Sequence, residues 1–487
     1  MRATGVVSVL VCCAASCAAA GAVVAQVPAA AALPRPAAYP SDGAWSDVGR
    51  EATELLQQYV RINTTNPPGH EIEAARWLQA VLARDGIEAR IFEPAPGKAN
   101  LVARLAGDGS ARPIVLLNHM DVVEATPEFW SVPPFAGLIR DGYLYGRGTV
   151  DMKGIGVSQL MGMVLLKRSG IPLKRDIIFV ANCDEEVGGL STLGAMWIAT
   201  QHPEIVRGAE YLLNEGGSAD VDPATGTIRY FGVGTTEKAP FWLRLTTHGR
   251  AGHGSRPVRD NAVATLVRAM DRLAAWETPL QVTPTVERFF HDLSGRESDP
   301  VRRAWFADVR AALADSEARR FLTSDVYFNA ILRNTVSVTV VRGSGKTNVI
   351  PPVASGEVDT RLLPGQDPQA FLAELRGVVN DTAVTIEPMG RIWDATESPA
   401  GTELMRVITE AVQQRHPGVL VTTPMLTAFT DSHYFRRLGI TAYGFDPWPL
   451  PISESGRIHG NDERIAPATV EYAAHLMFDV LRGIAAR

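Results

Sequence analysis

The sequence has little cysteine, with four in 487 residues. Three of them, Cys12, Cys13 and Cys17, lie in the first 25 residues, so the rest of the chain keeps only Cys183. A single cysteine forms no internal disulfide, and the fold must depend on its apolar core and on any bound metal. We interpret Cys183 as a buried packing residue rather than a nucleophile.

The chain also lacks an excess of positive charge. Its formal net charge is -6, with 46% hydrophobic and 21% charged residues, which is typical of a soluble globular protein. This balance argues against nucleic acid and anionic membrane surfaces as partners. The length is sufficient for two or three domains.

The first 25 residues differ in kind from the rest. Arg2 precedes an apolar stretch from Val6 to Val24 that ends in small residues before Gln26. This pattern predicts a signal peptide over residues 1–25, and therefore a secreted or periplasmic protein without a membrane anchor after cleavage. The alternative is an uncleaved anchor, because the run approaches the ~20 residues that span a bilayer. Residues 26–44 are rich in Ala and Pro and predict a flexible leader.

Apolar spacing then predicts alternating helices and strands. Helices are expected over 46–61, 71–85, 154–168 and from Ser191, and strands over 114–118, 176–181 and 211–214. This order is typical of an α/β fold with a mixed, largely parallel sheet flanked by helices, here the first part of a catalytic domain over 45–235.

From residue 236 the pattern changes to alternating half-buried strands, as in an α+β domain. We expect this second domain over 236–390, with a charged helical insertion at about 280–330. Residues 391–487 return to the first style and predict the second part of the catalytic domain. The α+β domain is therefore expected to be inserted into the first.

Histidine and acidic residues follow the ends of several apolar runs. His119 and Asp121 follow one strand, and Asp151, the pair Glu185 and Glu186, Glu215 and His459 follow later runs. Ligands of open α/β sheets gather at the carboxyl ends of the strands. A carboxylate at Asp121 can hold the imidazole of His119 in its ligating tautomer.

Carboxylate oxygens and neutral imidazoles together suit zinc. The five candidates His119, Asp151, Glu186, Glu215 and His459 give each of two ions three ligands if one carboxylate bridges them. Glu185 is adjacent to a ligand and is the candidate that moves the proton of a metal-bound water.

These segments resemble, in order and spacing, the di-zinc metallopeptidase family of aminoacylase, glutamate carboxypeptidase, acetylornithine deacetylase and carboxypeptidase S, and most closely the last branch. The resemblance covers nearly all of the chain after residue 45. The segments that carry it are Asn118-His119-Met120-Asp121, Gly146 to Gly154, Asp184-Glu185-Glu186-Val187-Gly188-Gly189, Asn214-Glu215-Gly216-Gly217 and Ile458 to Glu463.

The resemblance implies two Zn²⁺ per chain, with Co²⁺ or Mn²⁺ as substitutes. His119, Asp151 and Glu215 would hold one ion, and Asp151, Glu186 and His459 the other. It also implies that Asp121 orients the ligating histidine, that Glu185 is the general base, and that the Asp151–Met152 peptide bond is cis. One departure is Asn214, where close relatives often have Asp.

In the second domain, Gly249 to Ser255 resembles the family's lid motif. Its histidine, His253, is implied to stabilise the oxyanion, often from a neighbouring subunit, which would require a homodimer through the lid. Asn348 and Arg361 match positions that bind the substrate carbonyl and its terminal carboxylate. A surface salt bridge is the alternative for Arg361.

The expected function is zinc-dependent hydrolysis of an amide next to a free carboxylate, in N-acyl amino acids or short peptides. One alternative is an aminopeptidase or dipeptidase on the same metal core, which a preference for free N-termini would support. Another is a non-catalytic binding protein, which the retention of Glu185 and of every ligand disfavours.

Overall fold

The computed structural model describes residues 32–40, 45–188 and 191–487. The predicted signal peptide and most of the predicted leader lie outside these residues. Residues 34–487 form one compact unit. Among the described residues, none of the helices combines the length and the apolar character needed to cross a membrane.

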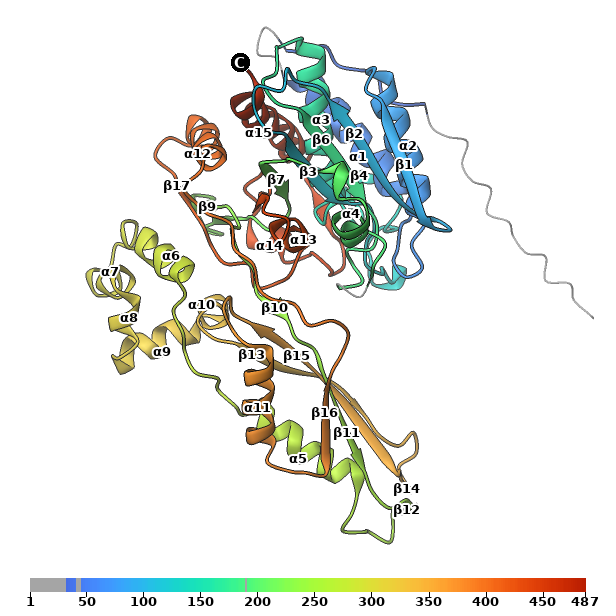
Figure 1. Ribbon diagram of the computed structural model, residues 1–487, viewed down its shortest axis with the longest axis vertical. Coiled ribbons are helices and arrows are strands. Elements are labelled where there is room, and N and C mark those ends of the chain that lie inside the picture. Colours follow the sequence, from blue (N-terminus) through green and yellow to red (C-terminus); the bar gives the residue numbers. More distant parts are fainter. Residues whose placement is uncertain (1–31, 41–44, 189–190) are drawn as a thin grey trace, which may run out of the picture. The chain divides into compact units, whose positions relative to one another are not determined.

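A six-stranded sheet organises the first domain (Figure 1). Its order is β1-β2-β6-β3-β7-β18, and β6, β3, β7 and β18 run parallel while β1 and β2 are antiparallel. The strands are β1 (Ala89–Ala95), β2 (Lys98–Leu105), β3 (Ile114–His119), β6 (Ile177–Asn182), β7 (Tyr211–Asn214) and β18 (Thr441–Gly444). Because β18 pairs with β7, the C-terminal part of the chain rejoins the sheet that the first part begins.

Helices cover both faces of this sheet, as its buried strands require. Val115 and Leu117 of β3 pack on one face against α4 (Ala195–Gln201) and α13 (Ser432–Arg436). The helices α1, α3 and α15 pack together, with α3 against β3 and β6. The helices of this domain besides α4 and α13 are α1 (Ser46–Arg61), α2 (Glu71–Arg84), α3 (Lys153–Ser169), α12 (Glu403–Arg415), α14 (Ile452–Ser455) and α15 (Pro467–Ala485).

Two small sheets and two short 3₁₀ helices complete the first domain. One sheet has the order β17-β9-β8 and the other β19-β5-β4. The elements are β4 (Leu138–Arg140), β5 (Tyr143–Tyr145), β8 (Ala219–Val221), β9 (Ile228–Gly232), β17 (Leu420–Thr422), β19 (Arg464–Ile465), η1 (Pro127–Phe129) and η2 (Pro203–Ile205).

The α+β domain, called the lid below, is a sheet with two helices on one face. β15 lies between β13 and β11, β16 follows β11, and β10 pairs with the end of β15. Leu243 and Leu245 point to the helices, while Arg244 between them is exposed on the open face. The elements are β10 (Ala239–Pro240), β11 (Leu243–His248), β12 (Gly252–His253), β13 (Thr335–Arg342), β14 (Val349–Ile350), β15 (Val353–Leu362), β16 (Val384–Pro388), α5 (Ala262–Ala274) and α11 (Pro368–Val379).

The segment predicted as a helical insertion contains five short helices around their own apolar core. Side chains that accept from the first free backbone N–H groups fix where these helices begin, as Thr283 and Asp299 do. Asp308 and Asp315 divide the stretch from Val301 to Phe321, which the sequence pattern did not resolve into separate helices. The helices are α6 (Pro284–Ser294), α7 (Pro300–Ala307), α8 (Val309–Ala312), α9 (Ser316–Ser324) and α10 (Val326–Ile331).

Candidate metal centre

The five side chains singled out as ligands meet at the carboxyl end of the parallel strands. β3 ends at His119, and Glu186 and Glu215 follow the ends of β6 and β7. Two groups have ligand atoms that all lie within 4.8 Å of one another, and they share one aspartate. The groups are His119, Asp151 and Glu215, and Asp151, Glu186 and His459.

Asp151 is placed between the two histidines. Its Oδ1 lies 3.2 Å from His119 Nε2, and its Oδ2 lies 3.0 Å from His459 Nε2. Each oxygen therefore faces a different imidazole, as a carboxylate that bridges two ions would. The Asp151–Met152 peptide bond that leads out of this residue is cis, as the resemblance implies.

The tautomer of His119 follows from the hydrogen bond of its Nδ1 atom. Nδ1 lies 2.9 Å from the backbone carbonyl oxygen of Asp121, which can only accept, so Nδ1 carries a hydrogen. In the neutral imidazole Nε2 then has a lone pair that faces oxygens of Asp151 and Glu215 at 3.2 and 3.6 Å. Either a proton on Nε2 or a metal ion between these atoms satisfies the facing acceptors. The buried Oε1 of Glu186 also has no hydrogen-bond partner among the described residues, so this set of side chains fits metal ions.

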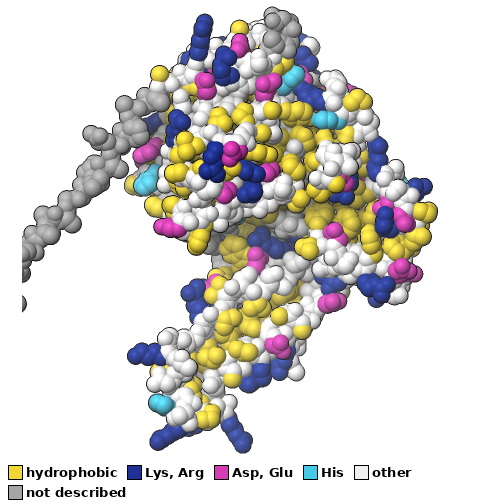
Figure 2. All heavy atoms as spheres, turned by 180° about the vertical axis from the view of Figure 1, so that it is seen from behind, with side chains coloured by type: hydrophobic (Ala, Val, Ile, Leu, Met, Phe, Trp, Pro, Cys, Tyr) yellow, Lys and Arg dark blue, Asp and Glu magenta, His cyan; other side chains and the backbone are white. Residues whose placement is uncertain are grey.

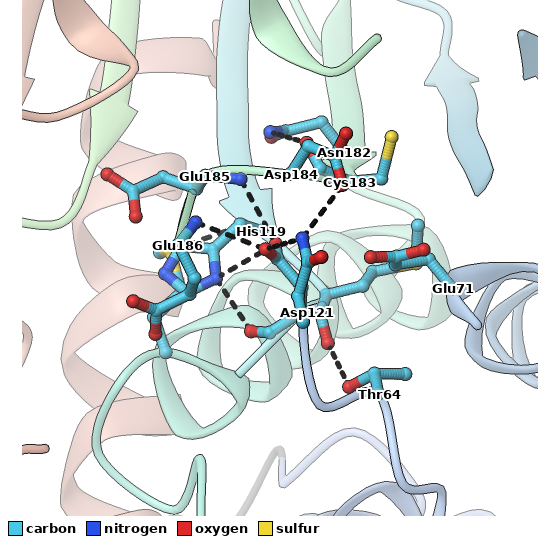
Figure 3. A network of polar contacts seen from close by, with 12 residues as sticks. Thr64, Glu71, His119, Asp121, Asn182, Cys183, Asp184, Glu185 and Glu186 are labelled. Atoms are coloured by element: carbon cyan, nitrogen blue, oxygen red, sulfur yellow. Dashed lines mark hydrogen bonds and ion pairs between the residues drawn. The ribbon is translucent and has the colours of Figure 1, made fainter. Parts of the chain in front are cut away.

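Asp121 contacts both His119 and the turn that follows β6. Its backbone carbonyl accepts from His119 Nδ1 at 2.9 Å, and its carboxylate Oδ1 lies 3.6 Å from the same nitrogen, beside the imidazole that the sequence interpretation assigned to it. The carboxylate also accepts hydrogen bonds from the backbone N–H groups of Glu185 and Glu186 at 3.2 and 3.1 Å (Figure 3). Asp121 thus fixes the turn that carries the general-base candidate and its neighbouring ligand.

The centre concentrates negative charge in a buried space. Burial, together with the carboxylate of Glu215, raises the pKa of Glu185 well above its usual range. Burial and the charge of Asp151 raise the pKa of Glu186 to about 7, and hydrogen bonds to Asp151 and Glu186 raise that of His459 to about 10. These pKa values are raised because the carboxylates outnumber the positive groups in this buried space. Bound divalent cations would offset this excess of negative charge.

A second layer of acidic residues supports the ligand loops. Asp446 accepts from the backbone N–H groups of Gly216 and Gly217, next to Glu215, and Asp431 accepts from the side chain of Asn182 at 2.6 Å. Neither residue was predicted from the sequence. Asp446 closely follows the end of β18, the signal that singled out the other acidic residues, whereas Asp431 begins a short helix and carries no such signal.

Asn66 and Lys98 connect Asp121 to two further carboxylates. Asn66 donates to Asp121 and Asp184, each at 2.8 Å, and Lys98 contacts Asp184 and lies 3.3 Å from Glu71. Burial raises the pKa of Glu71 to about 7. Cys183, beside this network, is buried, and burial raises the pKa of its thiol, in keeping with a packing role.

Two of the three predicted lid residues, His253 and Asn348, lie near each other, and Arg361 lies on a different strand. His253 in β12 is exposed and its Nδ1 lies 2.8 Å from Ser255 Oγ, while the carbonyl of the exposed Asn348 accepts from the N–H of Gly254. Figure 2 shows Lys, Arg and His side chains at the end of the lid where β12 and β14 lie. Arg361 lies on β15 and forms two hydrogen bonds with Asp359. Among the contacts described for residues 45–188 and 191–487, none joins His253 or Asn348 to the metal ligands.

Comparison with known proteins decides the family. Residues 115–483 match the model of peptidase family M20/M25/M40. The chain belongs to this family. It is 30% identical over 77% of its length to 74% of the human N-fatty-acyl-amino acid synthase/hydrolase PM20D1, and 30% identical over 74% of its length to 69% of a probable carboxypeptidase S-like 2 of Dictyostelium discoideum.

The fold agrees with that of solved M20 structures. An M20 family metallo-carboxypeptidase of Sulfolobus solfataricus superimposes with a TM-score of 0.69 at 18% identity, over 89% of this chain and 98% of that one. The predicted fold class and the resemblance to the carboxypeptidase and aminoacylase family are therefore confirmed. This M20 protein is a hydrolytic enzyme, in a family that includes dinuclear metal-binding peptidases.

Proposed function

We propose that this enzyme uses two zinc ions to hydrolyse an amide bond next to a free carboxylate, in N-acyl amino acids or short peptides. The observation that carries the proposal is the position of Asp151, whose two oxygens face the imidazoles of His119 and His459. Mixed imidazole and carboxylate ligands suit zinc, with Co²⁺ or Mn²⁺ as substitutes. When bound, the zinc pair lowers the pKa of a water molecule and polarises the scissile carbonyl.

The remaining steps belong to the side chains of the protein. Glu185 takes the proton of the attacking water and delivers it to the leaving nitrogen, and the contact of its backbone N–H with Asp121 fixes its turn. Arg361 binds the free carboxylate of the substrate through its guanidinium fork. His253 stabilises the oxyanion and Asn348 contacts the substrate carbonyl.

The substrate class is supported by the names of the two relatives above, an N-fatty-acyl-amino acid synthase/hydrolase and a carboxypeptidase S-like protein. The test is a panel of N-acyl amino acids, dipeptides and amino-acid amides, with the purified protein loaded with Zn²⁺, Co²⁺ or Mn²⁺. We expect turnover of the first two groups only. Turnover of amino-acid amides, which have a free N-terminus and no carboxylate, would favour an aminopeptidase instead.

The ligand assignment makes a separate prediction about metal content. Glu186→Ala removes a terminal ligand and should lower the occupancy of one ion, whereas Asp151→Ala should disturb both. Elemental analysis of the purified variants measures this directly, and Glu128→Ala on the surface is the control. An Asp151→Ala protein that still holds two ions per chain would exclude Asp151 as the bridge.

We further propose that the protein is exported and acts as a homodimer through the lid. The first proposal rests on the apolar segment of residues 1–25, and N-terminal sequencing of the protein from its native host should begin near Gln26. The second is supported by the exposure of His253 and Asn348 at the tip of the lid, where a partner subunit can bind them. Sedimentation equilibrium tests the oligomeric state.

A further inference from the structure

A hollow of about 570 Å³ lies on the open face of the lid sheet, within the range typical of small-molecule sites. Trp242 and Met389 line it and also line a smaller hollow, whose other lining residues are Gly188, Pro240, Arg391 and Trp393. The two hollows therefore share Trp242 and Met389.

Trp242 lies against the turn that carries the general-base candidate. A Cβ atom at Gly188 would lie only 2.6 Å from Cη2 of Trp242, so the close approach requires glycine at this position. The N–H of Gly188 donates to the carbonyl of Glu185, so both belong to one turn. The smaller hollow thus lies beside this turn, and Trp242 separates the turn from the larger hollow.

Asp359 connects Trp242 to Arg361. Its Oδ1 accepts from Trp242 Nε1 at 3.1 Å and from Arg361 Nε at 2.8 Å, and its Oδ2 accepts from Arg361 Nη2 at 3.2 Å. The guanidinium carbon of Arg361 lies 5.8 Å from the centre of the Trp242 ring. One carboxylate therefore holds both the guanidinium and the indole.

We propose that Trp242 forms the floor of a subsite for the side chain of the substrate's amino-acid half. Asp359 is a positioning residue for Trp242 and for Arg361. The proposal rests on the proposed function, in which Arg361 binds the substrate carboxylate. The first side-chain atom of an amino acid lies ~2.5 Å from its carboxylate carbon. A side chain whose carboxylate is held by Arg361 therefore starts within reach of the indole.

The part of the hollow beside the indole favours an apolar side chain. Of the charged residues that line the hollow, Arg244 and Glu357 form an ion pair at 3.1 Å and Asp359 pairs with Arg361, while Glu387 lies on the wall near Pro388. The neighbouring surface is made by the indole, Pro388 and Met389. Large aliphatic and aromatic residues such as Leu and Phe are thus preferred over Gly and Ala, because their burial against the ring removes apolar area from water.

The test compares two series of substrates on the metal-loaded protein. In one the acetyl group is constant and the amino acid is Gly, Ala, Leu or Phe, and in the other the amino acid is Gly and the acyl chain lengthens. For Trp242→Ala we expect the ratio of kcat/KM for Phe over Gly to fall about tenfold, the scale of one apolar side chain, with the acyl-chain preference unchanged. Trp305→Ala, a tryptophan in the helical insertion, is the control and should leave both preferences intact.

Asp359→Asn separates the positioning of Arg361 by Asp359 from the apolar contact between Trp242 and the substrate side chain. The amide oxygen of Asn can still accept from Trp242 Nε1 but no longer carries the charge that pairs with Arg361. The substitution should therefore raise KM for every substrate with a free carboxylate while leaving kcat and the Phe-to-Gly ratio close to the wild type. If Trp242→Ala does not fold, Trp242→Leu, which retains apolar volume, should still reduce the preference for Phe.

The other possible results distinguish failure of the subsite from failure of the proposed function. An equal loss for all amino acids in the Trp242 variants, or a change only in acyl-chain preference, overturns the subsite. A wild-type enzyme that turns over none of the panel with any of the three metals overturns the proposed function, and the subsite with it. Turnover by the wild type with an unchanged ratio in the variants overturns the subsite alone.

Discussion

Glu185 and Glu186 are neighbours in sequence with different surroundings. Only Glu186 belongs to a group of potential ligands, and Asp121 holds the backbone of both. Glu185→Gln should therefore keep both metals and lose about 10²–10⁴-fold in kcat, the range for a general acid–base group. Elemental analysis and steady-state rates measure the two properties separately. Near-normal turnover would show that Glu185 is not the base.

At the residue scale, the closeness of His119, Glu186 and Glu215 could be predicted because each follows a buried strand of the parallel sheet, and such strand ends meet at one edge. Asp151 and His459 lie in turns outside that sheet, so the strand pattern does not explain their place beside the other three. The role of the Asp121 carboxylate in holding the 184–188 turn could not be predicted, since it depends on where the backbone of that turn lies. Asp431 was missed for the same reason, because its contact is with Asn182, far away in the sequence.

At the scale of elements, the helices and strands with strong apolar spacing were predicted well. α1 covers Ser46–Arg61, as expected, whereas α4 begins at Ala195 rather than Ser191. Spacing alone does not determine such starts, because the seven residues of α4 contain too few turns to show a period.

Glu463 connects two elements that hold ligands. Its carboxylate accepts from the backbone N–H groups of Gly148, Val150 and Asp151 and pairs with the buried Arg147 at 2.8 Å. Glu463→Gln leaves Arg147 without its counter-charge and should destabilise the fold by about 3–5 kcal/mol, the scale of a broken buried pair.

Chemical denaturation measures this loss, and elemental analysis should show lower metal content because the Asp151 loop is no longer held. The matched control is Asp462→Asn, whose carboxylate bonds Ser131 at the surface. An equal effect of both substitutions would contradict the special role of Glu463.

Lys238 gives a pH-dependent prediction at the start of the lid. Its ammonium donates to the carbonyls of Ala330 and Arg333 and to Thr335, and burial lowers its pKa from about 10.5 to about 7. Between these values the unfolded chain binds the proton more tightly than the folded one. Wild-type stability should therefore rise with pH, relative to Lys238→Met, by up to about 1.4 kcal/mol per pH unit above pH 7.

Denaturant unfolding of the wild type and of Lys238→Met from pH 6 to pH 9 measures this difference. Arg229→Met, an exposed cation of the first domain, controls for the loss of a charge. A difference between wild type and Lys238→Met that stays constant over the range would mean that the pKa of Lys238 is unshifted.

At the scale of the whole molecule, the fold class follows from the order of helices and strands, and the structure confirms it. The proposed action of His253 and Asn348 at the metal centre does not follow from that order, because in the homodimer proposal it depends on contacts beyond one chain. Arg361, by contrast, lies on a strand whose end pairs with β10, where the lid begins.

The homodimer proposal predicts complementation between two inactive chains. If His253 acts on the metal centre of the partner, a mixture of His253→Ala and Glu185→Gln chains should regain up to about a quarter of wild-type activity, since one of the two sites in a mixed dimer has both groups. Subunit exchange is verified with differently tagged chains. No recovery after exchange would favour a histidine that acts within its own chain.

The return of the C-terminal segment to the first sheet has a consequence for biosynthesis. His119 is made early, whereas His459, β18 and α15 leave the ribosome after nearly all of the chain, including the entire lid. A nascent or truncated polypeptide therefore lacks a candidate ligand of the shared centre and the strand β18 that pairs with β7. We therefore expect hydrolytic activity only after translation of the chain is almost complete.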